Sequence, residues 1–207
     1  MKAANGVGDA IQLTNTKLPK ILFNWSPDGR YLIFTQTNPN TKTDAYLLQV
    51  SEKPDTVNNK PKVIINSEFN EFSGSISPDG KWLLYVSDES GQFQLYVRPF
   101  PGTGSKWQIS TANPAIGYFG WSVNGKEIYY RSASNKVMSV EVAQHGSEFE
   151  VGRATPLFDL PFSGQGIFDG VSKDNKHFLF RIPVQSTDIP PLTLVTNWDK
   201  KLKQRSE

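Results

Sequence analysis

The chain has 207 residues, of which 37% are hydrophobic and 12% aromatic, enough for a folded core. It contains no cysteine, which excludes disulfides, thiolate metal sites and cysteine nucleophiles. The net charge of +2 comes from 22 basic and 20 acidic residues, a balance that argues against nucleic-acid binding.

Four similar turns divide the chain at nearly regular intervals. Each begins with a serine, continues with turn-forming residues and ends with a basic residue directly before an apolar run. The turns are residues 26–30, 77–81, 122–126 and 172–176, and their serines lie 45 to 51 residues apart. A recurrence at this period predicts a repeated supersecondary unit.

Each residue type in these turns favours the backbone conformation that its position requires. Proline presets the first corner, aspartate bonds to nearby backbone, and the closing residue adopts a positive φ. Asparagine tolerates that conformation best among residues other than glycine, so the fourth copy keeps the turn. The closing residues are Gly29, Gly80, Gly125 and Asn175.

Four short strands are predicted around each turn. The run after the turn is apolar at consecutive positions, as expected of a strand buried on both faces. The strands before the turns contain Trp25, Ile76, Trp121 and Val171. Third strands are predicted at residues 45–50, 93–97, 136–142 and 192–196, and fourth strands at 63–65, 107–109 and 156–158. Four short antiparallel strands per repeat are typical of a propeller blade.

The sequence therefore predicts an all-β chain, a β-propeller of four-stranded antiparallel blades with about four blades present. We expect a single domain over residues 1–207, in which residues 11–23 hold a preceding or closing strand, at 11–14, and a link. The predicted blades are 24–66, 67–110, 111–159 and 160–198, the last without its own fourth strand, followed by a charged tail at 199–207. Residues 11–14 either close a ring by pairing with the last blade or belong to a preceding blade.

The repeats resemble TolB-like propeller repeats, which are bacterial and similar to WD repeats. The resemblance rests on the serine-proline-aspartate-glycine turns with their apolar strands. Further segments at 87–91, 95–102, 106–110 and 192–198 look like the C-terminal propeller of bacterial serine/threonine kinase fusions. Because such propellers are usually six- or seven-bladed, the resemblance implies that this chain is the C-terminal part of a longer ring. The sequence itself contains no kinase motif.

Catalytic and metal-binding interpretations find little support in the residue pattern. His145 is expected in a hairpin turn, and His177 is expected to pack as a strand residue. The repeated serines, together with Asp28, Asp79 and Asp174, are explained by turn geometry. We therefore expect no enzyme activity, no catalytic residue, no cofactor and no metal site.

Binding is the function that the pattern favours. Loops that join one blade to the next carry aromatic and polar side chains, as recognition surfaces do. Asp88 and Glu89 could bind a cation, whereas the favoured interpretation is that Asp88 caps the turn ending at Gly91. Phe72 and Phe119 could equally pack in the innermost strands. The candidate interaction residues are Asn70, Glu71, Phe72, Asp88, Glu89, Tyr118 and Phe119.

The predicted function is a non-catalytic scaffold for protein interaction or ligand sensing, as the C-terminal module of a larger bacterial protein such as a kinase fusion. Two alternatives stay open: the gating propeller of a prolyl-oligopeptidase-like serine peptidase, and a periplasmic envelope propeller that binds proteins. The partner is a protein, a peptide or a small ligand at the blade-link face, with no nucleic acid and no membrane span. We expect either that N-terminal blades are missing or that the chain self-associates. The expected compartment is periplasmic or extracytoplasmic if the chain is part of an exported or membrane-anchored parent, and cytoplasmic if the chain is complete as written.

Overall fold

The computed structural model describes residues 1, 5–50, 60–102, 104–111, 119–160 and 167–181. Over these residues it contains strands and turns but no helix, which confirms the predicted all-β class. The described part of the chain therefore also has no helix that could cross a bilayer.

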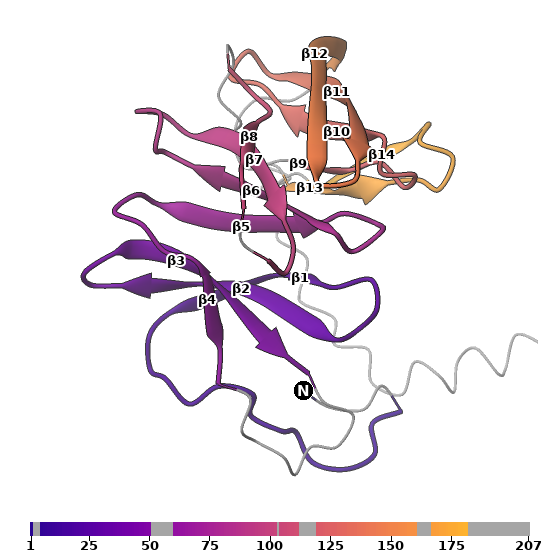
Figure 1. Cartoon of the computed structure of the whole chain (residues 1–207). Helices are drawn as coiled ribbons and strands as arrows, with labels where there is room; N and C mark the ends of the chain where they lie inside the picture. Colours follow the sequence, from indigo (N-terminus) through magenta and orange to yellow (C-terminus); the bar gives the residue numbers. More distant parts are fainter. Residues whose placement is uncertain (2–4, 51–59, 103, 112–118, 161–166, 182–207) are drawn as a thin grey trace, which may run out of the picture.

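The strands follow one another as simple meanders, so that each sheet is a blade made of consecutive strands. Blade 1 consists of β1 (Lys20–Trp25), β2 (Tyr31–Asn38), β3 (Lys42–Gln49) and β4 (Lys62–Ile65), and blade 2 of β5 (Glu71–Ile76), β6 (Trp82–Ser87), β7 (Gln94–Pro99) and β8 (Trp107–Gln108). Blade 3 consists of β9 (Phe119–Trp121), β10 (Glu127–Arg131), β11 (Lys136–His145) and β12 (Glu148–Asp159), and the described part of blade 4 of β13 (Ile167–Val171) and β14 (Phe178–Arg181). The sheets succeed one another in chain order from indigo to yellow (Figure 1).

The repeated turn joins the first two strands of every blade. In blade 1 the N–H of Gly29 donates to the carbonyl of Ser26 at 2.8 Å, and in blade 4 Asn175 donates to Ser172 at the same distance. Both closing residues have positive φ, 72° for Gly29 and 58° for Asn175. The predicted turn conformation is therefore confirmed, including the copy that lacks glycine.

The second strand of each of the first three blades is buried on both faces. Ile33, Leu84 and Ile128 are fully buried, which confirms the expectation drawn from their consecutive apolar neighbours. One apolar cluster joins blades 1 and 2, and a larger one joins blades 2 and 3. In blade 4 the side chain of Leu179 is 64% exposed, because among the described residues no further sheet covers it.

Specific contacts lock blade 3 onto blade 2. The indole Nε1 of Trp121 donates to the carbonyl of Ser75 at 3.1 Å, and that of Trp82 donates to Gln144 at 2.7 Å. Gly74 lies so close to the Phe119 ring that a side chain there would not fit. Blades 2 and 3 are therefore held together by specific hydrogen bonds and one close backbone contact as well as by their shared apolar cluster.

The prediction of a strand at residues 11–14 is wrong. This segment forms no strand, and the first strand begins at Lys20. Its Ile11 exchanges backbone hydrogen bonds with Met1, at 2.7 and 2.6 Å, instead of pairing with a blade. Leu13 packs against the outer face of blade 1, on a cluster of Leu32, Phe34 and Leu48. The apolar residue that suggested a strand thus covers a sheet face. The third strand predicted at 192–196 lies outside the described residues.

Candidate functional site

Two loops meet beside blade 1: the link from β4 to β5 and the loop from β6 to β7. The link from blade 1 reaches Glu71, the first residue of β5, which pairs with Ser87 at the end of β6. Asn70, one residue earlier, donates from its backbone N–H and from its Nδ2 to the two carboxylate oxygens of Asp88, both at 2.8 Å. Here we define the link face by the residues Asn70, Glu71, Phe72, Asp88 and Glu89.

The role expected for Asp88 is only partly right. Its backbone carbonyl accepts from Gly91 at 2.9 Å, so the predicted turn exists, but its carboxylate is used by Asn70. Burial alone would raise the pKa of Asp88, yet the hydrogen bonds from Asn70 outweigh it and hold the pKa below its ordinary value. Asp88 is therefore an ionised clamp between two loops.

Glu71 is the buried acid of the link face. It is 1% exposed, its Oε1 accepts a hydrogen bond from Ser67, and its Oε2 has no partner among the described residues. Burial raises the pKa of Glu71, and repulsion from Asp44, Asp88 and Glu89 adds to the rise. The carboxyl is thus held in an environment that disfavours its charge.

The rim of the link face is aromatic and charged. The Phe72 ring contacts the Phe93 ring edge to face, with centroids 5.6 Å apart, and Phe93 is 39% exposed. Glu89 forms an ion pair with Lys106, whose Nζ also lies 5.6 Å from the centre of the Tyr96 ring. Fixed aromatic and charged groups side by side are suited to recognising another polypeptide.

Two predicted candidates do not join this group. Phe119 begins β9 and packs against Gly74 at the junction of blades 2 and 3, so its ring serves blade packing. Tyr118 lies outside the described residues. Sequence reasoning also missed Ser67 and Asp44. Asp44 lies in β3, far from Glu71 in the chain, whereas Ser67 bonds to Glu71 from within the same link.

The repeated serines are engaged in their turns. The Ser26 hydroxyl donates to Asp28 at 2.6 Å and accepts from the backbone N–H of Tyr31 at 2.8 Å. The bond from Ser26, with further ones from Arg30, lowers the pKa of Asp28 to about 2. The turn function predicted for these residues is confirmed in this copy.

One serine lies beside a histidine and an aspartate, in blade 4. His177 Nδ1 is 3.5 Å from the Ser172 hydroxyl and 3.7 Å from Asp174, while Ser172 donates to Asp174. A nucleophile triad needs the serine and the acid on opposite ring nitrogens, whereas both groups here face Nδ1. The His177 side chain is 81% exposed, so the prediction that it packs is wrong. His145 ends β11 directly before Gly146 (φ 65°), in the predicted hairpin turn.

No group of three or more histidine and acidic side chains with metal-site geometry occurs within the described ranges. The two buried acids of this region, Asp44 and Glu71, each use one oxygen in a hydrogen bond, with Thr41 and Ser67 respectively. The arrangement on the link face thus provides hydrogen bonds, charge and aromatic surface for binding.

The fold that these blades define is that of the TolB-like β-propellers, seen here as part of a ring. Two solved structures show the likeness: a protein provisionally assigned as TolB from Agrobacterium tumefaciens and TolB from Acinetobacter baumannii. The first has a TM-score of 0.59 and 23% identity over 82% of this chain and 61% of that chain. The second has a TM-score of 0.59 and 20% identity over 84% of this chain and 40% of that chain.

One curated protein is similar to the chain in sequence. The chain is 26% identical over 183 residues to the uncharacterized protein Atu1656 of Agrobacterium fabrum, covering 82% of this chain. It spans 57% of the length of that curated relative. No family model matches the chain. The resemblance to kinase-fused propellers stays a prediction.

Proposed function

We propose that the chain is a non-catalytic propeller module and that its link face binds a protein or peptide partner. The observation that carries this proposal is the double hydrogen bond between Asn70 and Asp88, which fixes two loops beside exposed aromatic surface. A surface that is ordered before binding loses little conformational entropy on association. Loops held on a rigid sheet scaffold are common sites of recognition.

Site-specific crosslinking tests the binding surface. A photoreactive amino acid replaces Phe93 (39% exposed) on the link-face rim, and a matched variant carries it at Val123, a similarly exposed residue (44%) in the turn after β9. In bacterial extract, Phe93 is expected to crosslink a discrete protein that Val123 does not reach. The purified partner should then bind the chain, and Asn70→Ala should weaken binding about tenfold because the loop is no longer held. Identical crosslinks from both positions contradict the proposal.

We further propose that the module belongs to a longer propeller protein, with a kinase fusion as the parent that the motifs favour. The span of 57% of the curated relative and the exposed apolar side chains of β1 support this. Sequencing the DNA upstream of the Met1 codon tests it. A continuous reading frame with further blades or a kinase supports the proposal, and an unrelated gene contradicts it.

A further inference from the structure

A carboxylate and an aromatic ring lie across from each other at the mouth of the β6–β7 loop. Ser87 and Gln94 are the last pair of the β6–β7 ladder, so Asp88 and Phe93 follow that pair on the two sides of the loop. Successive residues of a strand alternate between its faces, and residues directly opposite one another share a face. The register therefore brings the two side chains to one face of blade 2.

Two further contacts show the same arrangement. Asp88 accepts hydrogen bonds from Asn70, and the Phe93 ring contacts the Phe72 ring. Asn70 and Phe72 are two residues apart where the chain enters β5, so their side chains point to the same side. The side chains that they contact, Asp88 and Phe93, therefore lie on that side as well.

The carboxylate of Asp88 is charged and accessible. Its two oxygens accept from the neutral Asn70, and in the described part of the chain it forms no ion pair. Burial works to raise the pKa of Asp88, but the bonds from Asn70 hold it below its ordinary value, so the carboxyl is ionised at neutral pH. Asp88 is partly exposed, and a carboxylate can accept more than two hydrogen bonds. A cation from outside therefore finds an unpaired carboxylate there.

The charges around Asp88 are mainly negative. Glu71, Asp88 and Glu89 form a group of acids whose charges repel one another. Of the nearby cations, Lys106 is bonded to Glu89, and Lys42 acts on Asp88 only from a distance. The field of the link face therefore attracts a basic side chain and repels an acidic one.

The Phe93 ring adds a flat apolar surface beside this charge. It is 39% exposed, and its edge-to-face contact with Phe72 fixes its orientation. The guanidinium of arginine is planar, stacks on aromatic faces and forms paired hydrogen bonds with a carboxylate, whereas the ammonium of lysine is a strongly hydrated point charge. A carboxylate beside a ring therefore favours arginine over lysine.

We propose that the link face binds an arginine side chain of its partner protein, with the guanidinium bonded to Asp88 and stacked on Phe93. This inference rests on the proposed function and names the chemistry that the partner presents. Acceptor and ring are held in place before the partner arrives, so little order has to be gained on binding. Charge complementarity selects a partner with a basic segment.

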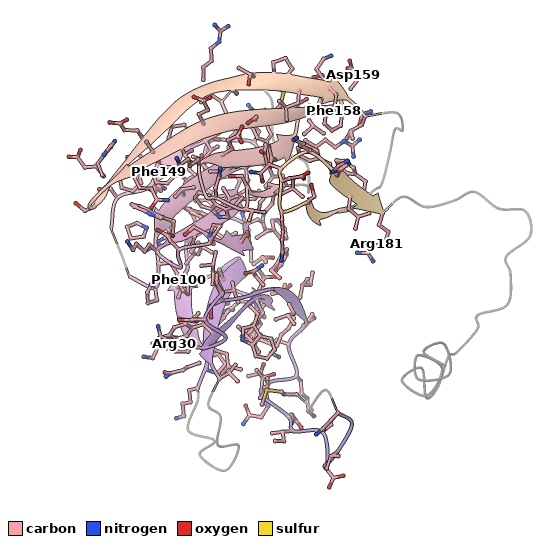
Figure 2. All side chains as sticks on the ribbon, turned by 90° about the vertical axis from the view of Figure 1, so that its right-hand side faces the viewer. Arg30, Phe100, Phe149, Phe158, Asp159 and Arg181 are labelled. Carbon is pink, nitrogen blue, oxygen red and sulfur yellow. The ribbon has the colours of Figure 1, made fainter. Side chains whose placement is uncertain are left out.

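A matched control acid is available at the opposite end of the blades, where the repeated turns lie. Figure 2 shows Arg30, the last residue of the blade 1 turn, toward the left, and Asp159 and Arg181, which end β12 and β14, toward the right. Glu141 in β11 pairs with Glu127, the residue directly after the blade 3 turn. Glu141 is therefore an exposed acid at the turn end, away from the link face.

Ligand binding by short peptides tests the chemistry on the whole chain. Saturation-transfer NMR detects weak ligands at low protein concentration. The probes are acetyl-Gly-Gly-Arg-Gly-Gly-amide, its lysine analogue and its citrulline analogue, which keeps the shape of arginine without its charge. We expect the arginine peptide to bind, the lysine peptide to bind more weakly and the citrulline peptide not to bind, and added salt to weaken the binding. Equal signals from the arginine and citrulline peptides, or none from the arginine peptide, overturn the proposal.

Variants of the whole chain test the place. Asp88→Asn keeps the size of the side chain but removes its charge, and it should weaken the arginine peptide about tenfold. Phe93→Leu removes the ring and leaves the bonds between Asn70 and Asp88 in place, and it should weaken the peptide about threefold. Glu141→Gln should leave the affinity unchanged. Unchanged affinity in Asp88→Asn or in Phe93→Leu, or an equal loss in the control, overturns the proposal.

Crosslinking from position 93 separates this inference from the proposed function. Benzoylphenylalanine keeps a ring there, and mass spectrometry of the product identifies the partner segment at this position. A segment that contains arginine supports both proposals, and a segment without arginine overturns the arginine site while the link face stays the binding surface. Failure to crosslink any protein contradicts the proposed function, whereas the peptide titration still decides on the arginine site.

Discussion

Glu71 is the residue of the link face whose charge the fold accommodates least. Its Oε2 is buried without a partner among the described residues, and the same holds for Oδ1 of the fully buried Asp44. An unpaired buried carboxylate oxygen loses its hydration without a full replacement. Burial raises the pKa of Glu71, because the folded state disfavours the charged form of this acid more than the unfolded chain does.

We expect Glu71→Gln to stabilise the chain at neutral pH and to have little effect in acid. With its pKa raised in the folded state, Glu71 binds a proton more tightly there than in the unfolded chain, so stability falls as pH rises through that range. The neutral amide removes this loss while its oxygen still accepts from Ser67. Urea unfolding at about pH 4 and about pH 8 measures both ends of the range.

The control for this prediction is Glu68→Gln, an exposed acid of the same link. It is expected to change the free energy of unfolding by less than about 0.5 kcal/mol at either pH. A Glu71→Gln variant that is less stable than the natural chain at about pH 8 would show that the charge is needed for folding.

Residue-level prediction from sequence succeeded where the partners are neighbours in the chain. The positive φ of Asn175 follows from its own turn, and so does the use of Asp28 by Ser26 and Arg30. The hydrogen bonds between Asn70 and Asp88 could not be predicted, because the two residues lie 18 positions apart in the chain. A local role as a turn cap already explained the aspartate in the sequence.

At the scale of elements, the second strands were the most predictable and the edge strands the least. Consecutive apolar residues leave a second strand few alternatives to burial on both faces. By contrast β12 was expected only at 156–158 but runs from Glu148 to Asp159, because the hairpin with β11 continues beyond the shared sheet. An exposed hairpin needs little apolar pattern, so its sequence signal is weak.

Gly74→Ala is expected to weaken the junction of blades 2 and 3. A Cβ at Gly74 would lie 2.1 Å from Cε2 of Phe119 and 2.4 Å from the backbone oxygen of Leu84. The strand or the ring has to shift, which should cost about 2 to 3 kcal/mol of the free energy of unfolding in a urea titration.

Two comparisons sharpen the prediction on Gly74. Gly102→Ala adds the same methyl group where no atom lies within 4 Å, and it should cost nothing measurable. Adding Phe119→Ala to Gly74→Ala should not restore stability, because the contact with the Leu84 oxygen remains. Full rescue by the double variant would place the strain in the ring contact alone.

At the scale of the whole molecule, the first blade has an outer face that is only partly covered. Trp25 and Trp121 hold the same position before the repeated turn, but only Trp121 donates to a neighbouring blade, at Ser75. Trp25 donates to Gly29 of its own turn and is 47% exposed, and Leu22 is 64% exposed. A strand with exposed apolar side chains invites association with another sheet.

We therefore expect the chain to self-associate as its concentration rises and Trp25→Ser together with Leu22→Ser to reduce this association. Light scattering over a concentration series measures the mean mass of both. Val123→Ser is the control, because it removes an apolar side chain about as exposed (44%) as Trp25 from a turn instead of from β1. The double variant should keep the fold, since Trp25 is already about half exposed and Leu22 more so. A natural chain that stays monomeric and melts cooperatively would show that the segment around Leu13 covers blade 1 well enough without any partner.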